Sequence, residues 1–280
     1  MIAPMLLGLC IFYVWPALQT LYFSFTEWGA FGKYQWSGAD NYQRLLRDAE
    51  VWQALRNTLL YTALSVPISI ALAIGIAVLL NQHIRGVGVY RTLFFLPAVT
   101  MPAAIAMVWQ WLFNGDYGLI NYLLSFLGLE GPRWLSHPRL ALYSVVAVGV
   151  WASIGSNMVI FLSGLQGIPR TYYEAAEIDG AGPFRQFFRI TLPLLTPTIF
   201  FATVLSLISA FQVFDLIYLM IGPNSPVIDN TQSVVYLFFE QAFLLNDKGY
   251  AATIIMLLFV IILAVTSLQF RLQRRWVHYG

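Results

Sequence analysis

The sequence predicts an all-α, polytopic membrane protein with six transmembrane helices. Of its 280 residues, 59% are hydrophobic and only 10% are charged, and the mean hydropathy is +0.70. A soluble domain carries roughly 45–50% apolar and about 25% charged residues, so this composition excludes a water-soluble enzyme. The apolar runs are continuous rather than alternating, which excludes a membrane β-barrel.

Six segments are long enough to cross a bilayer, because a spanning helix needs about 20 mostly apolar residues. Together they form a single membrane domain over residues 1–280, with spans at 2–25, 58–80, 93–113, 140–165, 194–221 and 251–270. Only the fifth contains a formal charge, that of Asp215. Five prolines are expected to kink the spans where neighbouring helices satisfy the freed carbonyls: Pro16, Pro67, Pro97, Pro102 and Pro197.

The distribution of charge predicts that both termini lie in the cytoplasm. With that orientation the short inner segments, 81–92, 166–193 and 271–280, hold eight arginines against three acids. The longer outer segments hold seven cations against nine acids. Because cytoplasmic loops are enriched in Lys and Arg, the cationic density favours this topology. The first span is expected to be retained, since no small-residue cleavage site follows it.

Other functional classes lack their characteristic residues. The only cysteine, Cys10, lies in an apolar run, and the three histidines are scattered, so we expect no metal site. The net charge of +2 is too small to indicate nucleic acid binding. No G-x-x-x-x-G-K-[ST] motif is present, so we expect no nucleotide site of that kind.

The inner loop 166–193 is much longer than a helix connection needs. Pro169 suits the first turn of a helix, the segment 172–178 is a good helix former, and Gly180 or Gly182 would end it. Pro183 then permits a second short helix that carries several phenylalanines. The sequence therefore predicts a helix–turn–helix knob on the cytoplasmic side.

This loop carries a family resemblance. It matches E-A-A-x3-G-x9-I-x-L-P at all seven fixed positions, which are Glu174, Ala175, Ala176, Gly180, Ile190, Leu192 and Pro193. The motif resembles the hallmark of permease subunits of binding-protein-dependent ABC importers. Further residues, including the run Phe211–Tyr218, are similar to those of carbohydrate permeases, which work in pairs. The chain resembles the first member of such a pair, the A-type subunit of maltose and glycerol-3-phosphate systems. The resemblance implies the type I importer fold in the prokaryotic inner membrane.

The resemblance also implies partners and roles. The chain would pair with a second six-span permease as a heterodimer, bind two ATPase subunits inside, and receive sugar from an extracytoplasmic binding protein. ATP and Mg would be bound by the ATPase, not by this transport subunit, and lipid would surround the spans. The 172–182 helix would be the coupling helix, with Glu174 in a cleft of the ATPase and Asp179 next to the turn at Gly180.

The substrate path is predicted from polar and aromatic residues within the spans. Sugars present hydroxyls and an apolar ring face, so amides, carboxylates and aromatic rings are expected around them. The candidates are Trp151, Asn157, Phe211, Gln212, Asp215 and Tyr218. An intramembrane acid usually faces a cavity or a partner. Asp215 could equally bond to helix backbone or to the sister subunit.

Two alternatives stay open. Within the importer class, glycerol-3-phosphate or another polyol phosphate is the second substrate after a di- or oligosaccharide, although no span interior contains an arginine. The distant alternative is an ion-coupled secondary carrier. Such carriers usually show inverted repeats and several intramembrane carboxylates, and this chain has one such acid and no visible repeat.

Overall fold

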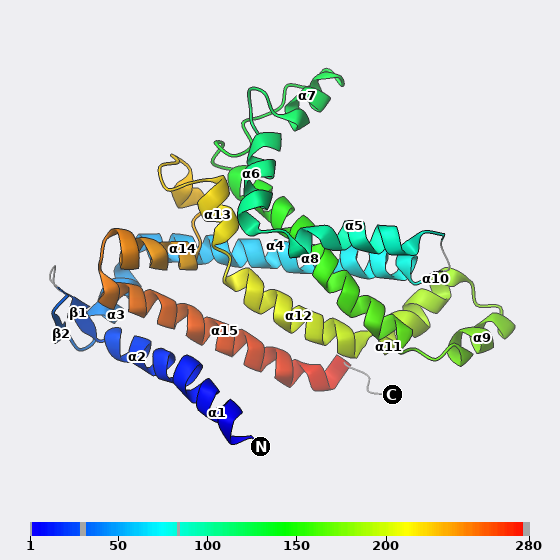
Figure 1. Ribbon diagram of the computed structural model, residues 1–280, viewed down its shortest axis with the longest axis horizontal. Helices are drawn as coiled ribbons and strands as arrows, with labels where there is room; N and C mark the ends of the chain where they lie inside the picture. The colour runs from blue at the N-terminus through cyan, green and yellow to red at the C-terminus, as the bar shows by residue number, and fades with distance from the viewer. Residues whose placement is uncertain (1, 29–31, 83–84, 277–280) are drawn as a thin grey trace.

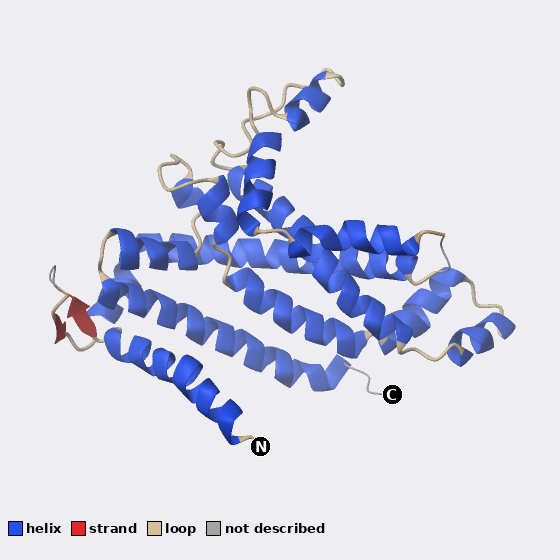
Figure 2. Cartoon of the chain, in the orientation of Figure 1, coloured by secondary structure: helices blue, strands red, loops and turns tan. Residues whose placement is uncertain are grey.

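Long apolar helices dominate the computed structural model, which describes residues 2–28, 32–82 and 85–276 (Figure 2). In this described part, four helical stretches are long and apolar enough to cross a membrane, and two bent pairs raise the number to six if each pair is one span. The first stretch is α1 (Ala3–Leu9), η1 (Cys10–Val14) and α2 (Trp15–Phe23). The other three are α4 (Ala49–Leu80), α8 (Ala141–Gln166) and α15 (Lys248–Trp276).

The two bent pairs depart from the continuous third and fifth spans that the sequence predicted. In the third, α5 (Val87–Val99) and α6 (Pro102–Leu112) meet at 100°. The kink expected at Pro102 is confirmed, because a proline keeps the preceding residue out of the helical region and Met101 is extended. The fifth begins earlier than predicted, with α10 (Pro183–Gln186), η2 (Phe187–Thr191) and α11 (Leu192–Leu194), and bends by 65° into α12 (Thr196–Phe211).

The predicted fifth span, 194–221, also breaks near its outer end. Helix α12 stops at Phe211, and a separate short helix α13 (Asp215–Met220) follows. The freed carbonyl of Val213 accepts a hydrogen bond of 2.6 Å from the hydroxyl of Ser233. This bond satisfies a buried backbone group outside a helix, so the break is stable although residues 212–214 contain no glycine or proline.

The long helices lie lengthwise beside one another, with short elements at both ends and on one side (Figure 1). One end carries the antiparallel pair β1 (Thr26–Trp28) and β2 (Tyr34–Trp36), in which Glu27 faces Gln35, together with α3 (Asp40–Arg47). The other end carries α9 (Thr171–Ile178). Helices α6 and α7 (Leu119–Ser125) project sideways. The remaining elements are η3 (Ile228–Asn230), α14 (Val234–Phe239) and η4 (Glu240–Leu244).

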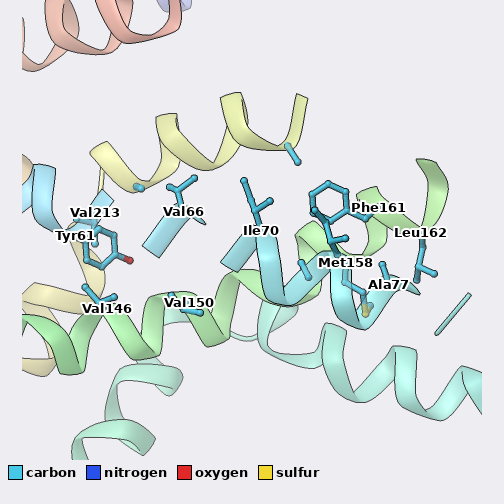
Figure 3. Close-up of a cluster of buried hydrophobic side chains, with 14 of the residues drawn as sticks. Tyr61, Val66, Ile70, Ala77, Val146, Val150, Met158, Phe161, Leu162 and Val213 are labelled. Atoms are coloured by element: carbon cyan, nitrogen blue, oxygen red, sulfur yellow. The ribbon is translucent and has the colours of Figure 1, made fainter. Parts of the chain in front are cut away.

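The main apolar core lies between α4, α8 and α12. Its fully buried members include Ala73, Phe161 and Met158, and the last two are labelled in Figure 3. Close approach of the backbones supports this packing, since a Cβ added at Gly155 of α8 would overlap the carbonyl oxygen of Phe94 on α5. Small residues serve this purpose between membrane helices, where van der Waals packing holds helices together.

Buried amides and hydroxyls join distant segments at the end that carries β1. Asn41 donates to the carbonyls of Ser24 (3.1 Å) and Thr26 (2.9 Å). Asn57 of α4 donates to the carbonyls of Asp229 (3.0 Å) and Gln232 (3.1 Å). The two bonds of Asn57 hold the segment before α14 against α4, and the two bonds of Asn41 hold α3 against the chain at 24–26. Each bond gives a backbone carbonyl a partner.

Candidate functional site

A cavity of about 490 Å³ opens where the two broken spans meet α4 and α8. Both breaks contribute to it, through Thr100 and Pro102 on one side and Gln212 to Asp215 on the other. Most of its polar groups are uncharged hydroxyls and amides. They belong to Tyr61, Ser65, Ser69, Thr100, Ser153, Ser156, Asn157, Ser206, Ser209 and Gln212.

Asp215 is the single formal charge in this lining, as far as the chain is described, and no Lys or Arg is present there. Asp215 is exposed, and its carboxylate has no hydrogen-bond or salt-bridge partner among the described residues. Asn157 is buried, and its Oδ1 accepts a hydrogen bond of 3.2 Å from the hydroxyl of Ser206 on α12. The cavity can therefore offer both donors and acceptors to a polar, uncharged molecule.

Three of the six residues predicted to form the path line this cavity, namely Asn157, Gln212 and Asp215. The other three lie outside its lining. Trp151 packs edge-on against Trp109, with ring centroids 5.4 Å apart. Phe211 is buried in the second core cluster, and Tyr218 stacks on Phe214 at 5.3 Å. Trp151 and Tyr218 thus pack against neighbouring rings, and Phe211 packs in an apolar cluster.

The residues that α4 contributes to the cavity were not predicted from the sequence. Tyr61, Ser65 and Ser69 recur every four residues, so they lie on one face of the helix, and all three line the cavity. A repeat of hydroxyls at this spacing inside an apolar span is a signal that could have been noticed. Ser206 and Ser209 of α12 were missed as well.

At the opposite end of the spans, the inner loop forms the expected short helix. Helix α9 contains Glu174, Ala175 and Ala176, and Asp179 is its C-cap. Gly180 has a φ of +73°, and its N–H donates to the carbonyl of Glu177 (3.0 Å). The next N–H, of Ala181, donates to the carbonyl of Ala176 (2.8 Å). These two bonds form a Schellman turn, in which glycine is favoured because its φ is positive.

The second half of the loop contains the other motif residues. Ile190 lies in η2, and Leu192 and Pro193 form the start of α11, all three partly buried. The tip is different, because several large apolar side chains face outward. Ile178 is 88% and Phe184 is 84% exposed, and Tyr172 and Phe188 are exposed as well. An exposed apolar patch on a loop is typical of a protein interaction site.

The chain is similar to known proteins over most of its length. Residues 69–278 match the family model described as "Binding-protein-dependent transport system inner membrane component". The probable ABC transporter permease protein YesP of Bacillus subtilis is 38% identical over 99% of this chain and 90% of its own length. The sn-glycerol-3-phosphate transport system permease protein UgpA of Agrobacterium fabrum is 35% identical over 100% of this chain and 95% of its own.

A trehalose/maltose transport system permease protein, MalF of Thermococcus litoralis, is 34% identical over 98% of this chain and 92% of its own. Among solved structures, a chain of a bacterial alginate ABC transporter in complex with an alginate-bound periplasmic protein superposes with a TM-score of 0.88, at 22% identity and over 100% and 94% of the two chains. The fold is thus that of an ABC transporter permease. The chain belongs to the family of inner membrane components of binding-protein-dependent transport systems.

Proposed function

We propose that this chain is the transmembrane subunit of an ATP-driven importer that moves a neutral di- or oligosaccharide into the cell. A second six-span permease would complete the pathway, and an extracytoplasmic binding protein would deliver the sugar. Two ATPase subunits, which bind ATP and Mg, would dock on the inner face. The observation that carries the proposal is the uncharged, hydroxyl-rich cavity between two broken spans in a chain of this family.

The cavity favours a sugar on chemical grounds. Its volume of about 490 Å³ lies within the roughly 300–1,000 Å³ common for small-molecule sites. Its serine, tyrosine and amide groups both donate and accept hydrogen bonds, as sugar hydroxyls do. Asn157, Gln212 and Asp215 would form the substrate path together with these hydroxyls. One relative, a trehalose/maltose transport system permease protein, supports the same class of substrate.

A polyol phosphate is the second candidate, because UgpA relatives carry glycerol-3-phosphate in their names. Proteins recognise phosphate through Arg or Lys and backbone N–H groups. No Arg or Lys belongs to the described lining, and the carboxylate of Asp215 would repel a phosphate. A phosphate substrate would therefore need its cationic partner from the second permease.

Helix α9 would transmit the force of the ATPase. Its exposed tip would insert into the ATPase, with Glu174 in the ATPase cleft and with Ala175 and Ala176 allowing close approach. The cationic inner segments support an orientation in which both termini and α9 are cytoplasmic. In Figure 1 the last helix ends on the side of the molecule that carries α9.

The composition of the purified complex tests this proposal. The tagged chain would be extracted from its native membrane in mild detergent, and its stoichiometric partners identified by mass spectrometry. We expect a second six-span permease and an ATPase. A lone or self-paired chain, obtained under conditions that preserve other membrane complexes, would contradict the proposal. The binding protein of the same system would then be screened against maltose, trehalose and sn-glycerol-3-phosphate to separate the two substrate classes.

A further inference from the structure

Two hydroxyls on the α4 wall of the cavity lack a hydrogen-bond partner. Tyr61 is 6% exposed and lines the cavity, and its phenol bonds to no described residue. Ser65, one turn further along, is 5% exposed, and its buried Oγ has no partner among the described residues either. One turn beyond, Ser69 donates to the carbonyl of Val66 (3.1 Å) and is satisfied. Tyr61 and Ser65 are thus the unsatisfied pair on this wall.

The packing around Tyr61 leaves its hydroxyl without a protein partner. A Cβ at Gly149 of α8 would overlap the phenolic oxygen, so this glycine makes the space that the hydroxyl occupies. Tyr61 belongs to the same apolar cluster as Val146 and Val213, which are labelled in Figure 3 and whose side chains cannot form hydrogen bonds. The apolar neighbours hold the ring in place while its polar end stays available at the cavity.

We propose that Tyr61 and Ser65 bind hydroxyls of the transported sugar and determine specificity for it. This inference rests on the proposed function. Most buried polar groups have partners, so the unpartnered Oγ of Ser65, one turn from a phenol that lines the same cavity and bonds to no described residue, indicates that a ligand supplies a partner. Both groups donate and accept, which matches a sugar hydroxyl, whereas a phosphate oxygen mainly accepts. A site built to bind a substrate hydroxyl discriminates against an analogue that lacks it.

Thr62 provides a matched control. It lies on the same helix, is 4% exposed, and its Oγ1 is also buried without a partner in the described part of the chain, yet it does not line the cavity. Thr62→Val therefore removes an unsatisfied hydroxyl of the same kind at a position that cannot touch the substrate. If unsatisfied hydroxyls on α4 mattered only for folding, this variant would behave like those at the cavity.

The experiment uses the complete transporter in liposomes, with ATP enclosed and with saturating loaded binding protein and radiolabelled maltose or trehalose outside. We expect Tyr61→Phe and Ser65→Ala each to lower the initial uptake rate about tenfold. Thr62→Val should stay within about twofold of wild type. The loss caused by Tyr61→Phe should be smaller for a monodeoxy disaccharide that lacks the hydroxyl bound by Tyr61. Equal co-purification of the ATPase would show that the variants assemble.

The outcomes separate the two levels of the proposal. If wild type imports either disaccharide while Tyr61→Phe and Ser65→Ala match it, the specificity role is wrong and the proposed function stands. A loss in Thr62→Val as large as that in Tyr61→Phe would also overturn the specificity role. If the wild-type complex imports neither disaccharide, the proposed function fails and the inference fails with it. Ser65→Ala carries the test on its own if Tyr61→Phe does not assemble.

Discussion

The hydroxyls of Tyr173 and Thr191 lie 3.0 Å apart and join the two halves of the inner loop. Tyr173 belongs to the exposed helix α9, whereas Thr191 is buried at the end of η2. From there the chain continues through α11 into α12, which lines the cavity with Ser206 and Ser209. This hydrogen bond therefore links α9 to the segment that leads into α12, a helix of the proposed substrate path.

Removal of this bond should weaken coupling without preventing membrane insertion. For Tyr173→Phe we expect ATP-driven uptake to fall several-fold, because one intramolecular hydrogen bond contributes about 0.5–1.5 kcal/mol. Tyr143→Phe is the control, since Tyr143 lies on α8 outside the loop, is 50% exposed, and its hydroxyl has no partner in the described chain. Uptake and ATP hydrolysis would be measured together. Unchanged uptake per ATP hydrolysed in Tyr173→Phe would show that the bond plays no part in coupling.

The turn after α9 should tolerate proline at one glycine and not at the other. Gly180→Pro forces φ from +73° to about −65° and removes the N–H that donates to Glu177. We expect normal insertion and no uptake. Gly182→Pro is the control, because Gly182 already has a φ of −69° and its N–H bonds to no described backbone carbonyl. Normal transport in Gly180→Pro would refute the coupling role of this turn.

The carboxylate of Asp215 should contribute to substrate binding. Asp215→Asn keeps the size of the side chain and removes its charge, and hydrogen bonds to a charged group are roughly twice as strong as neutral ones. We therefore expect a several-fold lower uptake rate at saturating loaded binding protein. Glu27→Gln serves as the control, because Glu27 of β1 is exposed and does not line the cavity. If Asp215→Asn transports like wild type, Asp215 has no place in the path.

The close contact between Gly149 and Tyr61 predicts a non-additive pair of substitutions. Gly149→Ala places a methyl group where the phenolic oxygen lies, and such overpacking costs about 1–3 kcal/mol. Adding Tyr61→Phe removes that oxygen and should recover part of the stability. Thermal unfolding of the purified complex in detergent measures both effects, with Gly75→Ala as a control because a Cβ there meets nothing within 4 Å. Additive losses would mean that the two residues do not meet.

Local features of the sequence predicted the inner loop well. The helix expected over 172–178 is found as α9. Of the two glycines expected to end it, Gly180 does so, with a positive φ and the Schellman bonds, whereas Gly182 has a φ of −69°. The bend beside Pro102 is also confirmed. In each case the residue acts on its own backbone or on that of its neighbours, so a short window of sequence contains the cause.

Features that depend on distant contacts could not be predicted in this way. The break at 212–214 contains no proline or glycine, and its carbonyl is satisfied by Ser233, twenty residues away in the chain. Similarly, hydroxyls in an apolar span usually bond back to their own helix, as Thr58 and Ser69 do. Ser65 does not, and nothing in its own stretch of sequence signals this. The position of the Tyr61 hydroxyl depends on the space that Gly149 of α8 leaves for it. The aromatic residues Trp151 and Tyr218 were expected in the path because composition does not tell which face a ring occupies.

The source of energy for uptake tests the function of this chain most directly. Liposomes would carry the complex that co-purifies with the chain, with its binding protein and a labelled disaccharide outside. We expect uptake to continue when the proton and sodium gradients are collapsed by ionophores, and to stop when ATP inside is replaced by a non-hydrolysable analogue. Uptake that persists without ATP and stops when the gradients are collapsed would contradict the importer function and indicate an ion-coupled carrier.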